Sequence, residues 1–288
     1  MNLCIYHSNC ADGFSAAWVV RKAIGEMRFY PGKYQEPPPD VTGCDVVMVD
    51  FSYKRPVLLE MSEKANSILI LDHHKTAQDD LIDLPANVTA KFDIEHSGAM
   101  LAWEHFFPDQ EPPPLLLHIE DRDLWRFKLP NTRQIQANVF SYPYDFHVWD
   151  TLMDTAPAAL AAEGEAIERK HFKDILELIG VTTRDMVIGG HRVPVANLPY
   201  TMSSDAGYEL AKGRPFAACY WDTPDGRVFS LRSRDDGADV AEVAKQYGGG
   251  GHRNAAGFRV SFAQAQAFEK SQGGLGRRNR RGGLGRSP

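Results

Sequence analysis

The sequence has no uninterrupted apolar stretch close to the roughly 20 residues that a membrane-spanning helix needs. Its N-terminal segment, MNLCIYHSNC, lacks the basic region and long apolar core of a secretory signal peptide. Its four cysteines show no CxxC spacing and are too few to cross-link a chain of 288 residues. These absences argue against a membrane, secreted or disulfide-rich protein and favour reduced thiols in the cytoplasm.

Acidic residues outnumber basic ones, and the excess is larger in the body of the chain than the total suggests. The formal net charge is −6, but the last sixteen residues hold five arginines and no acid. The remaining residues contain 27 basic and 38 acidic side chains, which gives a net charge of −11. Such a body is poorly suited to long duplex nucleic acid, which is held mainly by neutralising phosphates. A small phosphorylated substrate stays compatible, because bound cations can supply positive charge locally.

The first third of the chain alternates apolar runs with helical segments. Strands are predicted at 3–7, 44–51 and 67–74, with helices at 12–24 and 55–65. Near-continuous apolar strands separated by helices are typical of a parallel sheet that is covered on both faces. We therefore predict an α/β N-terminal domain with a doubly wound parallel sheet. In such sheets, ligands bind outside the carboxyl ends of the strands.

The rest of the chain predicts helices first and hairpins afterwards. Helices are expected at 96–107, 112–125 and 156–179, followed by hairpins at 186–198 and 215–233 and helices at 204–212 and 238–246. The Gly-Gly and TPDG sequences mark the two hairpin turns. We predict an N-terminal domain (1–155), a helical connector (156–184), a smaller α+β domain (185–270) and a disordered Gly/Arg tail (271–288). Contact of this tail with RNA is the lesser alternative.

Possible metal ligands cluster where the predicted strands end. Four separate segments contribute them: His7, Asn9, Cys10 and Asp12; Asp50; Asp72, His73 and His74; Asp121 and Asp123. Carboxylates mixed with imidazoles suit Mn, Fe or Zn, and the number of aspartates favours Mn. An Asp shared by two ions about 4 Å apart would form the two-metal clamp used in phosphoryl chemistry.

Each of these residues also has a purely structural interpretation. An Asp that follows a strand is often the N-cap of the next helix, and Asp12 fits that role. The Asp-His-His sequence could lie in an exposed loop, and Asp121 and Asp123 could be solvated charges at a helix end. The recurrence of acids or histidines at three strand ends of one sheet favours a common site over capping.

Five motifs in order resemble those of the DHH phosphoesterase family, which includes RecJ-type exonucleases, nanoRNases and manganese-dependent inorganic pyrophosphatases. NCADGFSAA, VMVDFS, LDHHKT and IEDRDLW are similar to its four catalytic motifs, and GGGGHRNAAGF (248–258) to its associated C-terminal domain. The resemblance extends over residues 3 to 260. It implies a DHH catalytic domain followed by a substrate-binding domain.

The resemblance also implies roles for individual residues. Asp12, Asp50, His73 and either Asp121 or Asp123 would ligate one metal ion, with Asp121 slightly favoured. His7 and Asp50 would hold a second ion, and Asp72 and His74 would complete the catalytic site. One position departs from the family pattern Asp-x-Asp-Gly, since Cys10 stands where the first Asp is expected. A thiolate prefers softer metals such as Zn, so the site near His7 could be weaker, differently occupied, or completed by Asn9 or water.

The glycine-rich segment predicts a site that binds phosphate. Gly249, Gly250 and Gly251 let the backbone approach a ligand closely and direct several N–H groups at it. Arg232 and Arg234 alternate on the preceding strand, and arginine forks match phosphate oxygens. His252 could contact the phosphate or a sugar hydroxyl. A flexible turn is the structural alternative for the glycine run.

These observations lead to one main hypothesis and two rivals. The main hypothesis is a cytoplasmic, Mn²⁺-dependent phosphoesterase, with Mg²⁺ or Zn²⁺ as alternatives, whose two domains enclose a cleft. By resemblance, its substrate is a short single-stranded oligonucleotide or a small nucleotide, cleaved by a 3′–5′ exonuclease, nanoRNase or nucleotide phosphatase activity. The rivals are a cyclic-dinucleotide phosphodiesterase or pyrophosphate/polyphosphate hydrolase, and a non-catalytic nucleotide-binding protein. No membrane partner is expected, and the sequence is compatible with a homodimer.

Overall fold

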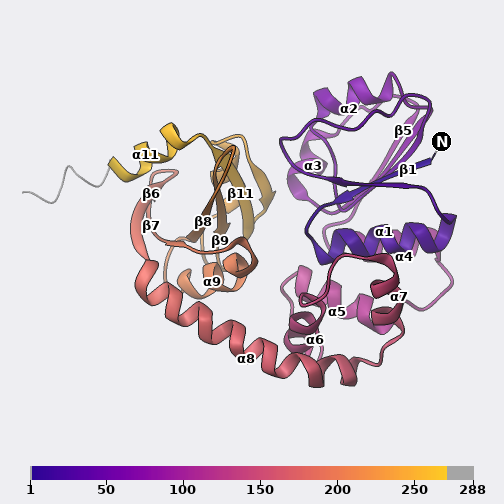
Figure 1. The fold of residues 1–288 in the computed structure, drawn as a ribbon. Coiled ribbons are helices and arrows are strands. Elements are labelled where there is room, and N and C mark those ends of the chain that lie inside the picture. The colour runs from indigo at the N-terminus through magenta and orange to yellow at the C-terminus, as the bar shows by residue number, and fades with distance from the viewer. Residues whose placement is uncertain (1, 271–288) are drawn as a thin grey trace, which may run out of the picture. The chain divides into compact units, whose positions relative to one another are not determined.

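The computed structural model describes residues 2–270, which fall into two compact units divided between Phe172 and Lys173. The Gly/Arg tail predicted at 271–288 lies outside the described residues. The division lies within helix α8 (Pro157–Thr182), in the segment predicted as a helical connector. Figure 1 shows the ribbon of both units and labels many of their helices and strands. Among the helices of residues 2–270, none combines the length and apolarity that crossing a membrane requires.

A five-stranded parallel sheet forms the centre of the first unit. Its strands are β1 (Asn2–His7), β2 (Arg28–Gly32), β3 (Asp45–Val49), β4 (Ser67–Asp72) and β5 (Val88–Phe92). Their spatial order is β2-β1-β3-β4-β5, and all neighbours pair in parallel. Because β1 lies between β2 and β3, the direction of the strand order reverses there. In open α/β sheets this reversal point is where ligands bind, at the carboxyl ends of the strands.

Alternating side chains of the central strands fill one apolar core on each face of the sheet. Leu3 and Ile5 of β1 belong to the core that includes Leu58 of α2 (Arg55–Ser62). Cys4, which points the opposite way, belongs to the core formed with α1 (Ala11–Ile24) and α4 (Gly98–Phe106). Figure 1 shows α2 on one side of the sheet and α1 with α4 on the other. This double cover confirms the predicted doubly wound parallel sheet.

Three further helices of the first unit extend the core that contains α1 and α4. They are α5 (Pro114–Asp123), α6 (Thr132–Val139) and α7 (Phe146–Asp154), whereas the short helix α3 (Lys75–Asp80) buries no residue. Helix α5 begins with prolines in its first turn, where the missing N–H groups cost nothing. Asp145 caps the N-terminus of α7, and its carboxylate accepts hydrogen bonds from the N–H groups of His147 and Val148.

The second unit is built on a six-stranded sheet. Its strands are β6 (Arg184–Ile188), β7 (His191–Asn197), β8 (Ala217–Thr223), β9 (Gly226–Arg232), β10 (Gly250–His252) and β11 (Ala255–Val260). The spatial order is β10-β11-β9-β8-β7-β6, and all neighbouring pairs are antiparallel except β7 and β8. The 3₁₀ helix η1 (Tyr200–Met202) and helices α9 (Ser203–Leu210), α10 (Val240–Lys245) and α11 (Phe262–Lys270) complete it. The smaller α+β fold predicted for this part is therefore present.

Candidate metal centre

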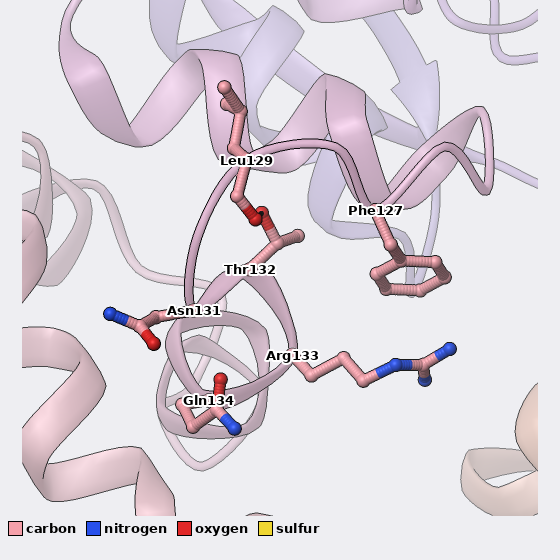
Figure 2. Close-up of a pocket in the computed structure, with 6 residues that line it drawn as sticks. All are labelled: Phe127, Leu129, Asn131, Thr132, Arg133 and Gln134. Carbon is pink, nitrogen blue, oxygen red and sulfur yellow. Dashed lines mark hydrogen bonds between the residues drawn. The ribbon is translucent and has the colours of Figure 1, made fainter.

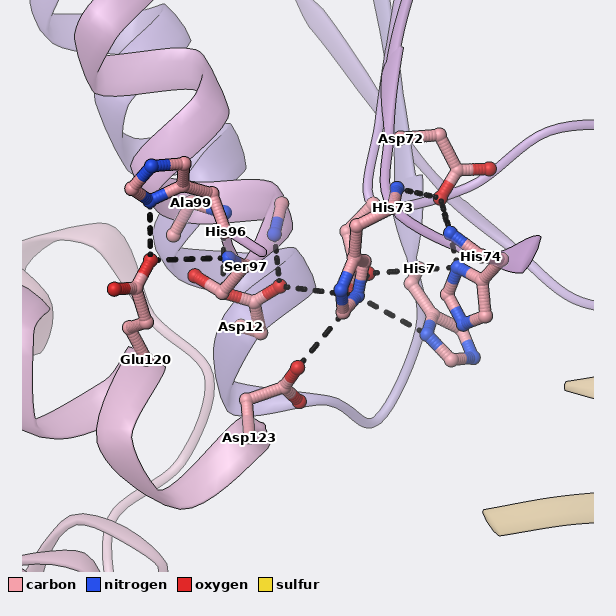
Figure 3. A network of polar contacts seen from close by, with 12 residues as sticks. His7, Asp12, Asp72, His73, His74, His96, Ser97, Ala99, Glu120 and Asp123 are labelled. Atoms are coloured by element: carbon pink, nitrogen blue, oxygen red, sulfur yellow. Dashed lines mark hydrogen bonds and ion pairs between the residues drawn. The ribbon is translucent and has the colours of Figure 1, made fainter. Parts of the chain in front are cut away.

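The carboxyl ends of three neighbouring strands bring together most of the predicted ligands. His7 is the last residue of β1, Asp50 directly follows β3, and His73 and His74 directly follow β4. These ends meet at the reversal of strand order, so side chains from distant parts of the sequence converge on one spot (Figure 3). The first turn of α1 adds Asp12, which is 1% exposed.

Asp12, Asp50 and His73 form the first group of ligand atoms. One atom from each lies within 4.8 Å of the others, and all three residues are buried. Nε2 of His73 is 3.0 Å from Oδ1 of Asp50 and 3.9 Å from Oδ2 of Asp12. Two carboxylates and one imidazole at this spacing can share one divalent cation.

His7, Asp50 and His74 form a second group whose ligand atoms also lie within 4.8 Å of one another. Nδ1 of His7 is 3.3 Å from Oδ2 of Asp50. The His7 side chain is 26% exposed, so this side of the cluster opens toward solvent. Asp50 belongs to both groups, and its two carboxylate oxygens face different histidines.

Asp72 lies behind the cluster and orients His74. Its Oδ1 is 2.7 Å from Nδ1 of His74 and also accepts hydrogen bonds from the N–H groups of His73 and His74. Its Oδ2 accepts a hydrogen bond from the hydroxyl of Ser52 at 3.0 Å. A carboxylate that contacts one imidazole nitrogen fixes the plane of the ring. The structure therefore gives Asp72 a positioning contact to His74.

Asp12 connects the cluster to the N-terminus of α4. Its two carboxylate oxygens accept hydrogen bonds from the N–H groups of Gly98 and Ala99, at 2.7 and 3.0 Å. These N–H groups have no partner within the helix, and the helix dipole favours a negative charge at this end. The N-cap role considered for Asp12 on α1 is not what the structure shows, because the residue preceding α1 is Cys10, without a side-chain cap bond.

Gly98 and the backbone of Asp50 reveal constraints that the motifs did not indicate. A Cβ at Gly98 would lie 2.4 Å from Cβ and 2.8 Å from Cα of Asp50, so only glycine permits this approach. Asp50 itself has φ of 52°, a left-handed conformation that is uncommon outside glycine and often found at functional sites. The short HSG sequence at 96–98 is the signal that could have pointed to Gly98.

The structure places Asp123 at the cluster and Asp121 away from it. Oδ2 of Asp123 is 3.5 Å from Nε2 of His73, as Figure 3 shows. The carboxylate of Asp121 instead accepts hydrogen bonds from the N–H groups of Lys128 and Leu129 and from the hydroxyl of Thr132. Asp121 thus organises the loop after α5. The preference for Asp121 as the ligand is reversed by this placement.

Cys10 lies near the cluster but outside both ligand groups. Burial and the charges of Asp50, Asp123 and Asp12 raise the pKa of its thiol well above the usual value. A protonated thiol is a weak ligand. Asn9 has φ of 52° and shapes the turn between β1 and α1; no hydrogen bond of its side chain links it to the cluster within the described residues.

The buried charges of the cluster shift one another's pKa values. Burial opposes ionisation of Asp50, yet hydrogen bonds from His7 and His73 hold its pKa well below the usual value. Burial acts against a charged imidazole, but Asp50 and the other carboxylates raise the pKa of His73 to about 10. Burial, together with the charges of Asp50 and Asp123, raises the pKa of Asp12 well above its usual range. A proton on His73 therefore compensates part of the carboxylate charge in the metal-free protein.

The donor set fits a divalent cation. Buried carboxylates need compensating charge, and the first ligand group holds two of them, with Asp123 close by. Oδ2 of Asp50 is buried, and Nδ1 of His7 lies 3.3 Å from it. A buried carboxylate oxygen that faces an imidazole nitrogen at this distance is suited to share an ion with it. The cluster is therefore a candidate metal centre, and its oxygen and nitrogen ligands suit Mn, Fe or Zn.

Two neighbours of the cluster were missed by the sequence reasoning. The ring of Tyr34 lies 5.3 Å from the ring of His7 and 5.9 Å from that of His74, and Tyr34 is 45% exposed. Glu120 is 9% exposed and accepts hydrogen bonds from the N–H of Ser97 and from Nδ1 of His96. No motif marks Tyr34, because it lies in the loop after β2. Glu120 directly precedes Asp121 and could have been noticed there.

The predicted substrate-binding arginines lie at the end of β9 in the second unit. Arg232 is the last residue of β9 and donates hydrogen bonds to the hydroxyls of Ser204 and Ser230. Arg234 lies beyond the strand, where its guanidinium is 3.9 Å above the ring of Tyr208. Both arginines contact α9, Arg232 through Ser204 and Arg234 through Tyr208. The expectation that both alternate along one strand is wrong, because β9 ends at Arg232.

The glycine-rich segment forms a hairpin rather than an open loop. Gly250, Gly251 and His252 are strand β10, which pairs with β11. A Cβ at Gly249 would lie 2.1 Å from the carbonyl oxygen of Gly257, and one at Gly251 would lie 2.5 Å from that of Ala255. The close backbone approach that these glycines permit is therefore to β11. This contact accounts for the glycines structurally, and their role in phosphate binding stays a prediction.

Comparison with known proteins gives one sequence relative and several similar folds. No known protein-family profile matches the chain. The chain is 32% identical over 287 aligned residues to the uncharacterized protein R106 of Acanthamoeba polyphaga mimivirus, covering 91% of this chain and 68% of R106. The DHH domain of PF0399, a member of the S1p family of ribosomal proteins, superposes with a TM-score of 0.58 at 15% identity, covering 94% and 86% of the two chains. PggH, a pGpG-specific phosphodiesterase from Vibrio cholerae, gives a TM-score of 0.47 at 15% identity, covering 94% and 96%.

Proposed function

The chain belongs to the same protein family as mimivirus R106 and has the DHH-type phosphoesterase fold, and from this premise we propose that it is a metal-dependent phosphoesterase. Its reaction would be the hydrolysis of phosphoester bonds in short oligonucleotides or small nucleotides, with water as the nucleophile. The fold alone does not specify this chemistry, because one fold can support many activities. The proposed chemistry therefore depends on the cluster around Asp50.

The observation that supports the proposal best is that Asp50 belongs to two ligand groups at once. His73 and Asp12 lie on one side of it, and His7 and His74 lie on the other. A carboxylate between two cations can hold them about 4 Å apart. Two cations at that separation stabilise both the attacking and the leaving oxygen in displacement at phosphorus.

We propose Mn²⁺ as the metal, with Mg²⁺ and Zn²⁺ as alternatives. Asp12, Asp50, His73 and Asp123 would hold one ion, and His7, Asp50 and His74 would hold the other. Mixed carboxylate and imidazole ligands suit Mn²⁺ better than Mg²⁺, which prefers oxygen ligands alone. The bound ions would make a water molecule easier to deprotonate and would neutralise charge on the phosphate.

The protein's own contribution is the positioning of these groups. Asp72 contacts Nδ1 of His74 at 2.7 Å and so fixes the plane of the imidazole beside the second ligand group. Asp12 is fixed by two N–H groups of α4, which prevents it from turning away from the cluster. Preorganised groups of this kind stabilise developing charge without reorganisation during the reaction.

The substrate class rests on charge and on the second unit. An acidic chain favours short substrates over long duplex nucleic acid. We propose that Arg232, Arg234 and His252 of the second unit, with the glycines before His252, bind the phosphate or nucleotide portion of the substrate. A double substitution of both arginines with glutamine is then expected to raise KM for a dinucleotide, measured by steady-state kinetics.

Turnover of a small substrate panel tests the proposed activity. We expect hydrolysis of a dinucleotide in Mn²⁺ that stops when a chelator removes the metal. Asp50→Asn is expected to lower kcat by about 100-fold or more, because the residue would lose its charge toward both ions. Asp45→Asn, at the opposite end of the same strand, is the matched control and should keep full activity. Dinucleotide hydrolysis that survives Asp50→Asn in Mn²⁺ would refute the shared-ligand assignment.

The same panel separates the rival activities. Cyclic dinucleotides, phosphoadenosine phosphate and pyrophosphate are the informative alternatives. Preferred turnover of a cyclic dinucleotide or of pyrophosphate would identify the rival hydrolase. Binding of a dinucleotide without any turnover in excess Mn²⁺ would favour a non-catalytic nucleotide-binding protein. In that case, turnover by the Cys10→Asp variant would show that the Cys10 thiol causes the loss of activity in the wild type.

A further inference from the structure

A pocket outside the metal centre lies in the loop that follows α5. It has a volume of about 180 Å³ and is formed by residues from the loop and the start of α6 (Figure 2). The lining residues are Phe127, Leu129, Asn131, Thr132, Arg133 and Gln134. Pockets for drug-sized ligands are typically about 300–1,000 Å³, so this one can hold only part of a substrate. One nucleobase is a part of suitable size.

The pocket combines stacking surfaces with positive charge. The guanidinium of Arg133 is 3.8 Å from the centroid of the Phe127 ring. Residues 124–133 contain three cationic side chains and no acid, in a chain whose net charge is −6. Bases of single-stranded nucleic acid bind by stacking on aromatic rings and guanidinium planes, while cations attract the backbone. Residues 124–133 thus carry positive charge in an acidic protein, and an anionic nucleotide requires positive charge.

Two amide side chains, those of Asn131 and Gln134, also line the pocket. In Figure 2 they lie on the other side of α6 from the side chains of Phe127 and Arg133. Gln134 donates its Nε2 to Glu168 at 2.6 Å, which leaves its carbonyl oxygen as an acceptor. Amides offer both donors and acceptors, so they can hydrogen-bond to different bases. This arrangement favours binding of a base without strong sequence preference.

Helix α5 connects this pocket to the candidate metal centre. Asp121 accepts hydrogen bonds from the N–H groups of Lys128 and Leu129 through its carboxylate and from that of Phe127 through its carbonyl oxygen. Asp123, two residues further along the same helix, is 3.5 Å from Nε2 of His73. Two residues correspond to about 3 Å of rise along a helix. One short element therefore fixes both a metal-centre residue and the loop that forms the pocket.

We propose that this pocket is a subsite for one base of a short oligonucleotide whose phosphoester is hydrolysed at the metal centre. The base stacks on the Phe127–Arg133 pair, in a pocket that Asn131 and Gln134 also line. The inference rests on the proposed function, because it assigns part of the same substrate. It adds a specificity element in the first unit, in addition to the arginines proposed in the second.

Binding without catalysis gives the first test. The dinucleotide ApA is titrated calorimetrically into the protein in EDTA, so that no hydrolysis occurs. Arg133→Gln and Phe127→Leu are each expected to weaken binding about 10-fold, which is the effect of losing one stacking contact. Phe127→Tyr keeps the ring and should bind as the wild type does. Equal affinity of wild type, Arg133→Gln and Phe127→Leu would overturn the proposal.

The matched control removes a cation from another aromatic ring of the first unit. Arg21 lies 5.2 Å above the ring of Phe146, near the end of α1 that is remote from Asp12. Arg21→Gln should leave the affinity for ApA unchanged. Inorganic phosphate serves as a second probe, and its binding should not differ between wild type and Phe127→Leu. Equal weakening for phosphate and ApA would assign the pocket to phosphate and overturn the base subsite.

Kinetics separate this proposal from the proposed function. With Mn²⁺, Arg133→Gln should raise KM for ApA about 10-fold with little change in kcat, and should leave KM for methyl p-nitrophenyl phosphate unchanged. If the wild type hydrolyses ApA and its KM is unaffected by Arg133→Gln, the subsite is refuted and the phosphoesterase stands. If the wild type hydrolyses nothing but Arg133→Gln still weakens ApA binding, the phosphoesterase is refuted and the pocket stands as a nucleotide-binding site.

Discussion

At the scale of single residues, the candidate centre depends on which carboxylate of a close pair faces it. Asp121 and Asp123 are two residues apart on α5, so their side chains point about 200° apart around the helix axis. Only one of them can reach His73, and the structure places Asp123 there. The sequence alone could not decide this, because both residues lie within the same motif. The loop whose N–H groups bind the carboxylate of Asp121 has positive φ at Trp125, Phe127 and Asn131. None of these residues is a glycine, so the sequence gives no sign of this backbone conformation.

Substitutions at this pair are expected to have different consequences. Asp123→Asn should lower the affinity for Mn²⁺ at least about 10-fold and leave thermal stability nearly unchanged, because the residue makes few structural contacts. Asp121→Asn should lower the melting temperature, because its carboxylate satisfies two N–H groups and one hydroxyl. Calorimetric titration with Mn²⁺ measures the metal affinity, and scanning calorimetry measures the melting temperature. Loss of metal affinity in Asp121→Asn alone would contradict the placement.

His73 predicts a pH-dependent exchange of a proton for the metal. In the metal-free protein its pKa is raised to about 10, so the ring is protonated throughout the range from pH 7 to 9. An imidazole must lose that proton before it can ligate, so metal binding should release at least one proton at pH 8. Release should diminish as the pH rises through about 10, because the ring is then already neutral.

Calorimetry in two buffers of different ionisation enthalpy measures this exchange. The apparent enthalpy of Mn²⁺ binding at pH 8 should depend on the buffer, and the dependence gives the number of protons. The Asp45→Asn protein is a suitable control, since this residue lies at the other end of β3. A binding enthalpy independent of the buffer at pH 8 would show that His73 is not a ligand.

At the scale of secondary structure, the centre depends on how closely α4 approaches β3. The N-terminus of α4 holds Asp12 and contacts Asp50 through Gly98. Gly98→Ala would place a methyl group 2.4 Å from Cβ of Asp50, so the helix has to shift. We expect a destabilisation of about 1–3 kcal/mol and a weaker metal site, because Asp12 moves with the helix.

A matched glycine substitution distinguishes this effect from helix propensity. Gly180 lies in α8, and a Cβ there meets nothing within 4 Å. Gly180→Ala should stabilise the protein by about 0.5–1 kcal/mol, since alanine is the better helix former. Urea unfolding measures both variants, and Mn²⁺ titration measures the site. Gly98→Ala with wild-type stability and wild-type metal affinity would contradict the role assigned to this contact.

The predictability of the elements follows from their burial. Strands β1, β3 and β4 are central and nearly continuous in apolar residues, so the sequence predicted them. Strands β2 and β5 are the edges of the sheet and were missed. The first contains Pro31 and the second mixes exposed with buried positions, and both features weaken the pattern of a strand. The convergence of His7, Asp50 and His73 followed from the predicted parallel sheet, because carboxyl ends share one edge.

At the scale of the whole molecule, each unit has its own apolar cores, which suggests that the two unfold separately. Residues of the first unit form the two cores that cover the faces of its sheet, and residues of the second unit form two further cores. All residues of both ligand groups that include Asp50 lie in the first unit. A metal that binds there should stabilise that unit, because only its folded state assembles the ligands.

Scanning calorimetry with and without Mn²⁺ tests this separation. We expect two transitions, of which one shifts upward when Mn²⁺ is added and the other stays in place. At a concentration 100 times the dissociation constant, the stabilisation is about 2.7 kcal/mol. For a unit of about 170 residues, this corresponds to a shift of about 5–10 °C. Asp50→Asn should abolish the shift and retain both transitions. A single transition that moves as a whole would show that the units unfold together, and an unchanged scan in saturating Mn²⁺ would remove the basis for a metal centre in the first unit.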